Sequence, residues 1–280
     1  MSKYSFLILH YISIDDTISC IESIEKLYSK YDYNIVIVDN GSYNNSGVVL
    51  KQMYENDPKI TVILSKKNLG FANGNNLGFK YIKDNLKSDY IIMINNDIVM
   101  IDKDFLDKVD KTYKKEEFAV LGPKIILKDG SVSKYRGKLN TVKEQKKLIR
   151  YLYFRLFLNY IFLTPLIEKY RKRKRNNNFE LKLESNIILH GSALIFSKKY
   201  IDLFDGIDDR TFLYCEEELL YIRLMKNNLK SIYNPDLYLQ HNEDGATKSS
   251  NKNSRKKNIF VDKNLIKSNK ILLEELKSLE

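Results

Sequence analysis

Carboxylate and amide side chains gather at four places in the sequence, each beside an apolar run. They are Asp39-Asn40, Asn95-Asn96-Asp97, the acidic cluster Glu216-Glu217-Glu218 and the loop NLGFANGNN at 68–76. An acid at the end of a strand can hold a divalent cation, which in turn bridges a diphosphate. Glycine lets a backbone approach a ligand closely, and N–H groups at a helix start bind phosphate. An acid across the crevice can act as a general base. Together these residue types suit a nucleotide-diphosphate ligand.

Each of these motifs alone also has a purely structural explanation. The Asp-Asn-Gly-Ser and Asn-Asn-Asp stretches are good turn sequences, because Asn and Gly tolerate positive φ. Acids in the first turn of a helix complement the helix dipole, and the Gly/Asn loop could be a connector that ends in an Asn cap. His241 alone is more often a surface or core histidine than a ligand. The chemical interpretation therefore depends on whether these sites converge.

The first half of the chain alternates apolar runs with helix-like segments, and this alternation predicts convergence. The strand candidates are 5–11, 34–39, 60–65 and 90–95. Near-continuous apolar strands of this kind are typical of a parallel sheet that is covered on both faces. The alternation indicates βαβ crossovers and a doubly wound α/β core. Ligands bind such sheets beyond the carboxyl ends of the strands, where these motifs lie.

The composition fits one large domain, or a domain with an appendage, of 280 residues that are 43% hydrophobic. The two cysteines, Cys20 and Cys215, form no CxxC motif. They favour a reducing compartment and argue against a disulfide framework or a structural zinc site. The N-terminal residues lack the long apolar region and the cleavage site of a signal peptide. We therefore expect a cytoplasmic protein.

The order of the motifs resembles that of bacterial family 2 glycosyltransferases. The matching stretches are VIVDNGS, NLGFANGNN, MINNDI, HGSALIFSK, FLYCEEELLYIR and QHNEDGATKS, and LHYISIDDTISCIESI resembles the opening strand and helix of the family. The resemblance covers residues 4–247 except for 134–178, and it is strongest to the rhamnosyltransferase-like subgroup of surface polysaccharide synthesis. It implies a GT-A fold, a Rossmann-like and mostly parallel sheet flanked by helices, over residues 1–248.

The resemblance implies a site for a nucleotide-sugar donor. Asp39 would hydrogen-bond the pyrimidine base, and His10 and Tyr11 would line the base and ribose. The other implied donor-binding residues are Asn40, Asn68, Gly70, Asn73, Asn75, Asn76, Asn95 and Asn96. Those at 68–76 would shape the ribose–phosphate cradle, which would explain why this loop carries no charge.

The resemblance also implies a metal site and a catalytic base. Asn95-Asn96-Asp97 stands in the place of the family's Asp-x-Asp motif, so Asp97 would bind Mg²⁺ or Mn²⁺, and His241 would join the metal or the diphosphate. Glu217 occupies the position of the catalytic acid. Supporting roles fall to Glu216 and Arg223, which would help to hold the acidic cluster. Two positions depart from the family pattern: Asn95 replaces the first acid, and Leu219 stands where relatives often carry a second Asp.

The implied reaction is an inverting single displacement. A sugar would move from dTDP-rhamnose or a UDP-hexose to a hydroxyl of a growing, lipid-linked cell-surface glycan. Alternatives are a catalytically inactive glycan- or membrane-binding module on the same fold, a nucleic-acid-binding protein or a nucleotidyltransferase. A nucleic-acid-binding motif is missing, so we expect no nucleic-acid partner. Nucleotidyltransferases need a Gly-rich loop after the first strand, where this chain reads HYISIDD.

A basic, aromatic segment at 134–178 interrupts the alternation, and the chain carries a net charge of +11, which suggests an anionic partner. Its apolar part, 151–167, is too short and too interrupted to span a membrane, which takes about 20 apolar residues. The segment is either a helical insert on the acceptor side or an interfacial helix on the inner, anionic face of the plasma membrane. The tail at 249–280 has an amphipathic pattern that predicts a helix. The sequence leaves the acceptor, the linkage and the oligomeric state open.

Overall fold

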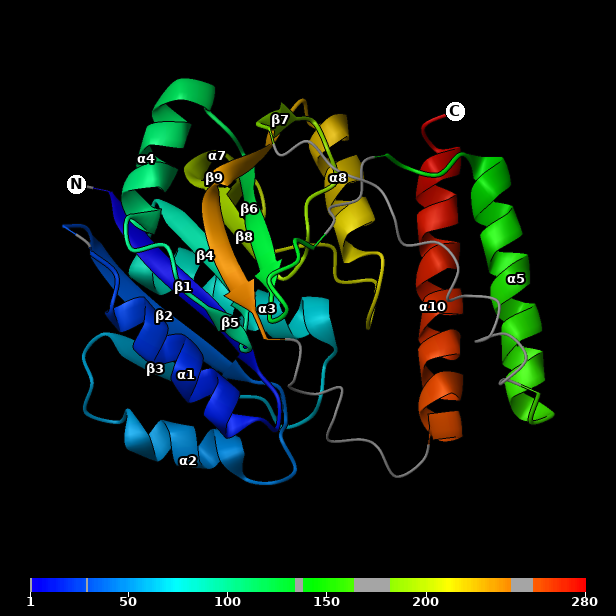
Figure 1. Cartoon of the computed structure of the whole chain (residues 1–280), viewed down its shortest axis with the longest axis horizontal. Helices are drawn as coiled ribbons and strands as arrows, with labels where there is room; N and C mark the ends of the chain where they lie inside the picture. The colour runs from blue at the N-terminus through cyan, green and yellow to red at the C-terminus, as the bar shows by residue number, and fades with distance from the viewer. Residues whose placement is uncertain (1, 29, 134–137, 164–181, 243–253) are drawn as a thin grey trace.

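One sheet passes through the molecule, with helices packed on both of its faces (Figure 1). The computed structural model describes residues 2–28, 30–133, 138–163, 182–242 and 254–280. Within these ranges the sheet has nine strands in the order β3-β2-β1-β4-β8-β6-β9-β5, with β7 paired to β9. The strands are β1 (Lys3–His10), β2 (Asp32–Asp39), β3 (Ile60–Leu64), β4 (Tyr90–Asn95), β5 (Ile98–Val99), β6 (Val120–Leu127), β7 (Glu184–Ser185), β8 (Ala193–Ser197) and β9 (Ser231–His241). The mixed α/β class predicted from the sequence is confirmed.

The helices lie in the connections between the strands, except for α10, which follows the last strand. They are α1 (Ile14–Glu25), α2 (Ser46–Met53), α3 (Phe71–Tyr81), the π-helical turn η1 (Ile82–Leu86), α4 (Phe105–Glu116), α5 (Val142–Tyr160), α7 (Lys198–Ile201), α8 (Glu216–Lys226) and α10 (Ser254–Lys277). None of the helices in the described ranges is both long enough and apolar enough to cross a membrane.

Both faces of the central strands are buried, which explains their near-continuous apolar sequences. Successive side chains of a strand point to opposite faces. In β1, Phe6 and Ile8 belong to the core that includes Ile21 of α1, while Leu7 belongs to the core that includes Phe79 of α3. A polar residue within these strands would therefore meet a packed core on either side.

The strands at 3–95 are parallel and in register. β1 pairs with β2 and β4, and β2 pairs with β3. His10 lies opposite Asp39, and Leu9 lies opposite Asn95. The residues that follow the apolar runs therefore share one edge of the sheet, as the sequence predicts.

Strand β8 runs in the opposite direction, antiparallel to β4 and β6. Because an antiparallel strand begins where its neighbour ends, the residues before β8 lie at the carboxyl end of β4. The Asn95 backbone N–H donates to the Ser192 carbonyl at 2.9 Å. Strand β9 then ends at His241, opposite Ile98 of β5. The reversal of β8 brings the HGSAL stretch to the edge where β4 ends, whereas β9 runs parallel to β6, in the same direction as β4, and so ends with His241 at that edge.

Helices α5 and α10 form a pair to one side of the sheet (Figure 1). Thr141 and Glu144 form a capping box at the start of α5. The residues that interrupt the apolar sequence of α5, Arg155 and Asn159, both bind the buried Asp262 of α10. The predicted helices of the insert and of the tail thus pack on each other, while residues 164–178 of the insert lie outside the described ranges.

We expect Asp262→Ala to lower the free energy of unfolding by about 3–5 kcal/mol, because it leaves the buried Arg155 guanidinium without its anion. Urea titration of both proteins measures this difference. The control is Asp202→Ala, which removes an exposed pair with Lys198 and should cost no more than about 1 kcal/mol. Equal, small effects of the two substitutions would show that Asp262 does not hold α5 and α10 together.

Candidate active site

Asp39 lies at the carboxyl end of β2 and is only 5% exposed. Its carboxylate accepts the Ser42 backbone N–H at 3.1 Å, which closes the turn after the strand. Next to it, the Tyr11 side chain is half-buried at the end of β1. Asp39 thus lies at the carboxyl end of β2, the position predicted for the residue that binds the base.

His10 is fully buried, and both of its ring nitrogens have partners. Nδ1 bonds the Thr17 hydroxyl and Nε2 the Ser46 hydroxyl, each at 2.7 Å. Burial lowers the pKa of the imidazole, against the opposing effect of Asp39, so the ring is neutral near pH 7. His10 thereby ties α1 and α2 to β1 beside Asp39. A direct contact of His10 with a base stays a prediction. Its hydrogen bonds instead hold the helix starts next to the end of β1.

The amides at 68–70 and Asn40 form one connected network. The Asn40 Nδ2 donates to the Gly70 carbonyl at 3.0 Å, and its Oδ1 accepts the Leu69 N–H at 2.9 Å. Asn68 accepts the Gly70 N–H at 2.9 Å. Gly70 has a φ of +85°, and an added Cβ would meet the Phe212 carbonyl, so this position needs glycine. The network fixes the start of α3 against the segment that precedes α8.

Two asparagines of α3 bind the same segment. Asn73 donates to the Asp209 carbonyl at 2.8 Å. Asn76 makes a pair of hydrogen bonds with the backbone of Ile207, each at 2.9 Å. Asn75 donates to Phe71, and its buried Oδ1 has no partner in the described structure. These amides therefore join α3 to residues 207–212, and their contacts with a nucleotide stay predictions.

Asp97 and His241 form a close polar pair. Asp97 Oδ1 lies 3.0 Å from His241 Nε2, and the Asn242 N–H donates to the Asp97 carbonyl. Asn96 reaches back to the Thr17 hydroxyl at 3.1 Å, and Asn95 ends β4. Among the described residues no group of three or more His, Cys, Asp or Glu side chains could hold a metal ion.

The Asp97–His241 pair nevertheless fits a divalent cation as a two-residue site. A carboxylate oxygen and an imidazole nitrogen already face each other, and the His241 Nδ1 is buried without a partner in the described structure. Mg²⁺ typically takes only one or two protein ligands and completes its shell with phosphates and water. The metal site stays a prediction that this geometry permits.

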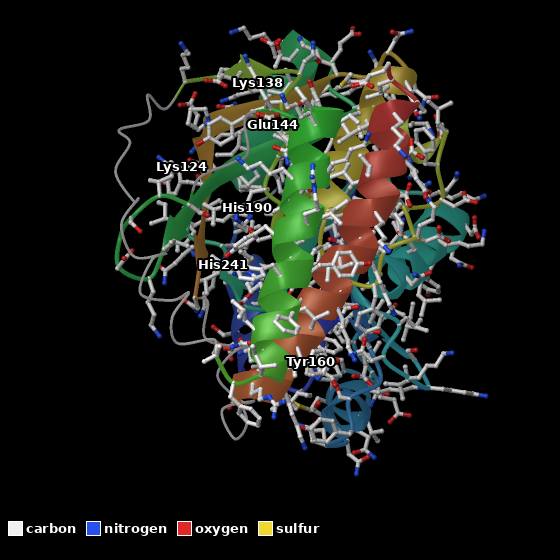
Figure 2. The ribbon with its side chains drawn as sticks, turned by 90° about the vertical axis from the view of Figure 1, so that its right-hand side faces the viewer. Lys124, Lys138, Glu144, Tyr160, His190 and His241 are labelled. Atoms are coloured by element: carbon white, nitrogen blue, oxygen red, sulfur yellow. The ribbon has the colours of Figure 1, made fainter. Side chains whose placement is uncertain are left out.

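A residue that the sequence analysis did not single out, His190, lies next to this pair. The rings of His190 and His241 are edge to face, with centroids 6.4 Å apart (Figure 2). The Ser192 N–H donates to His190 Nδ1 at 3.2 Å. A backbone N–H can only donate, so Nδ1 is the acceptor, and Nε2 carries the proton of the neutral ring. The signal in the sequence was the HGS stretch itself, since it precedes a strand at the site.

Glu217 is held by the residue that follows His190. The Gly191 N–H donates to Glu217 Oε1 at 3.3 Å. A Cβ at position 191 would lie 2.8 Å from that oxygen, so the glycine makes room for the carboxylate. The three residues 190–192 thus link the Asp97–His241 pair to the predicted catalytic base.

The acidic cluster begins α8 on a strained backbone. Tyr214 and Cys215 have φ values of 76° and 69°, a conformation that non-glycine residues rarely adopt. Such strain concentrates at functional sites. Glu216 turns inward and accepts a hydrogen bond from Thr211 at 3.0 Å, while Glu217 is half-buried.

Arg223 supports the cluster indirectly. It donates to the Gly206 carbonyl at 2.7 Å and to the Tyr200 hydroxyl, and it pairs with Asp208 at 3.7 Å. These contacts hold the segment that leads into the cluster. Leu219, by contrast, is buried against Leu272 of α10. This contact explains why an apolar residue occupies that position here.

Burial raises the pKa of Glu216 to about 7, and the neighbouring Glu217 adds to this effect. The folded protein thus keeps a proton that the unfolded chain loses above about pH 4.5. We expect the stability that the neutral carboxyl provides to be lost as the pH rises from about 4.5 to about 7. Glu216→Gln should remove this loss. The free energy of unfolding of the variant, relative to that of the wild type, should therefore rise by about 3 kcal/mol from pH 4 to pH 8.

Urea titrations of both proteins across this pH range measure the difference. The control is Glu55→Gln, an exposed substitution that should leave the pH profile unchanged. Parallel profiles for wild type and Glu216→Gln would contradict the raised pKa.

This chain resembles known proteins in sequence and in fold. The model of the family described as "Glycosyl transferase family 2" matches residues 5–204. The low-salt glycan biosynthesis hexosyltransferase Agl10 of Haloferax volcanii is 28% identical over 232 residues, which cover 82% of this chain and 64% of the relative.

Solved structures of S. aureus TarS 1-349 share the fold. The complex with UDP has a TM-score of 0.54 at 15% identity, covering 93% of this chain and 65% of that chain. The complex with UDP-GlcNAc has a TM-score of 0.55 at 16% identity, covering 94% and 65%. This chain spans slightly less than two thirds of the length of each of these relatives.

The rhamnosyltransferase-like subgroup stays a prediction. The GT-A fold is shared, the family model covers more than half of the sequence, and the chain belongs to glycosyl transferase family 2.

Proposed function

We propose that this chain is an inverting glycosyltransferase that moves a hexose from a nucleoside-diphosphate donor to a hydroxyl of a glycan. The observation that carries the proposal is the 190–192 loop. In this loop the Gly191 N–H bonds Glu217, and the preceding residue, His190, lies edge to face with His241 of the Asp97–His241 pair. A base and a polar diphosphate site on either side of one loop suit a displacement in which an acceptor attacks as a diphosphate leaves.

Glu217 is the proposed base. Only one of its oxygens, Oε1, takes part in the hydrogen bond with Gly191, and the side chain is half-buried at the start of α8. In the proposed step the carboxylate takes the proton of the acceptor hydroxyl while the hydroxyl oxygen bonds to the anomeric carbon. The bond from that carbon to the diphosphate oxygen breaks, and the diphosphate leaves with the electron pair.

A pyrimidine nucleotide is the proposed carrier of the sugar. Asp39 offers a buried carboxylate at the strand edge, and the titles of the TarS structures name UDP and UDP-GlcNAc. A UDP-hexose is therefore our first donor, with dTDP-rhamnose as the alternative. The Haloferax relative is named for glycan biosynthesis, which supports a glycan acceptor; we propose a lipid-linked one on the cytoplasmic side.

Asp97 and His241 are the proposed ligands of Mg²⁺ or Mn²⁺. When bound, the cation neutralises negative charge on the diphosphate. The protein's own part is to hold the two ligands in contact, which it does by pairing β5 with the end of β9.

We expect UDP with Mn²⁺ to raise the thermal stability of the protein, by roughly 2.7 kcal/mol at about 100 times the Kd. Asp97→Ala should lose the metal-dependent part of this stabilisation. Glu217→Gln should keep it and lose about 10²–10⁴-fold in kcat, because only the proton transfer is removed. Differential scanning fluorimetry with UDP, dTDP and their sugars, and release of nucleotide from the donor, measure the two effects.

The control for both substitutions is Glu55→Gln, which is exposed and outside the site. A Glu217→Gln protein with near-normal turnover would exclude Glu217 as the base. A wild-type protein that binds donor but never transfers sugar would indicate an inactive glycan-binding module on this fold.

We expect Gly191→Ala to lower kcat by about 10²-fold with little change in nucleotide binding. The added Cβ would displace the Glu217 carboxylate by a fraction of an ångström to an ångström, which is enough for such a loss. The control is Glu55→Gln, an exposed substitution outside the site. Steady-state kinetics measure kcat for the two variants, and the thermal shift with UDP measures their nucleotide binding. An unchanged kcat in Gly191→Ala would mean that the placement of Glu217 does not limit the reaction.

A further inference from the structure

Helix α5 carries a continuous exposed stripe at helical spacing. We call these residues the α5 stripe: Lys143, Lys146, Lys147, Arg150, Tyr153, Phe154, Phe157, Tyr160 and Ile161. The first two turns are basic and the later turns are aromatic and aliphatic. Phe154 and Phe157 are each 57% exposed.

The opposite side of α5 fixes how the helix is rotated. Gln145 is fully buried and donates to Asn269 of α10 at 2.7 Å. Further along the helix, Asn159 binds Asp262, and Ile149 and Leu152 are buried. Because these residues hold one side of α5 against the protein, most of the α5 stripe is held outward. At its border, the rings of Tyr153 and Tyr160 contact Lys270 and Lys263 of α10. Figure 1 shows α5 as the outermost helix on its side of the molecule, and Figure 2 shows it in front, with Tyr160 toward its end.

Single exposed apolar residues are normal on a protein surface, whereas a contiguous exposed patch marks an interaction site. The aromatic half of the stripe covers two turns of one helix and continues into Phe162, which is 70% exposed. Aromatic rings and cations share the exposed side of α5 while its other side is packed, and both residue types favour the interface of an anionic membrane.

We propose that the α5 stripe docks on an anionic membrane surface. The aromatic rings would enter the headgroup region, where such rings concentrate, and the cations would meet anionic lipid. The stripe includes four cations, and the nearby Glu144 is engaged in the capping box with Thr141. The basic run RKRKR at 171–175 adds charge of the same sign in the sequence.

Charge favours lipid over a second copy of this chain. The α5 stripe contains no acid, so a second copy would offer its four cations no counter-ion. Anionic headgroups neutralise the cations and leave them hydrated. Docking itself does not depend on the transfer reaction. Docking would bring the proposed active site to a lipid-linked acceptor, and this purpose rests on the proposed function.

Flotation of the full chain with phospholipid vesicles tests this proposal. We expect binding at low salt to vesicles of phosphatidylcholine with phosphatidylglycerol, and weak binding to phosphatidylcholine alone. The Phe154→Ser/Phe157→Ser protein should bind at least about tenfold more weakly, because two large apolar groups no longer enter the interface. Lys146→Glu/Lys147→Glu should weaken binding to the anionic vesicles in particular.

The matched control is Val49→Ser/Met53→Ser, which removes two exposed apolar residues from α2 and should bind like the wild type. Failure of the wild type to float, equal binding to neutral vesicles, or unchanged binding of the phenylalanine variant would each overturn the proposal. Self-association that the same variant abolishes, without flotation, would overturn it in favour of a second copy. Stabilisation by UDP, measured on the same proteins, tests the donor site separately, so the two proposals can fail independently.

Discussion

The antiparallel insertion of β8 between β4 and β6 is the constraint on which the rest of the site depends. The parallel strands alone bring Asp39 and Asn95 to one edge. Only a strand that runs the other way can begin at that edge, and the residues before it then lie beside the end of β4. The hydrogen bond from Asn95 to Ser192 locks this start. At this start His190 lies beside His241, which ends the parallel strand β9, and the Gly191 N–H bonds Glu217.

The charge-free loop at 68–76 has a structural role that its composition did not reveal. Its amides bind the backbone at 207–209, while Asn40 holds its first residues. A charged side chain in these positions would lose hydration without a counterion, whereas an amide supplies both a donor and an acceptor. Helix α3 and the segment that leads to the acidic cluster are therefore connected by neutral hydrogen bonds. The same amides that suit a nucleotide also suit this purpose.

The C-terminal helix explains a departure from the family pattern. Leu219 is packed with Leu272 and Leu276 of α10, so an acid there would be buried among apolar side chains. Helix α10 in turn positions α5 through the buried Asp262. The tail thus belongs to the same packed structure as the acidic cluster. This arrangement links the surface proposed to meet lipid to the helix that carries the proposed base.

The sequence by itself determined the four strands at 3–95, their parallel arrangement, and the placement of Asp39 and Asp97 at or just after strand ends. These features are local, because an apolar run followed by turn residues is enough to define a strand and its end. Only the tertiary structure decided the partners: His10 with Thr17 and Ser46, Gly191 with Glu217, and Arg155 with Asp262. The reason is physical. Each of these contacts depends on the direction of a side chain and on the pairing of separate elements, which no local pattern in the sequence specifies.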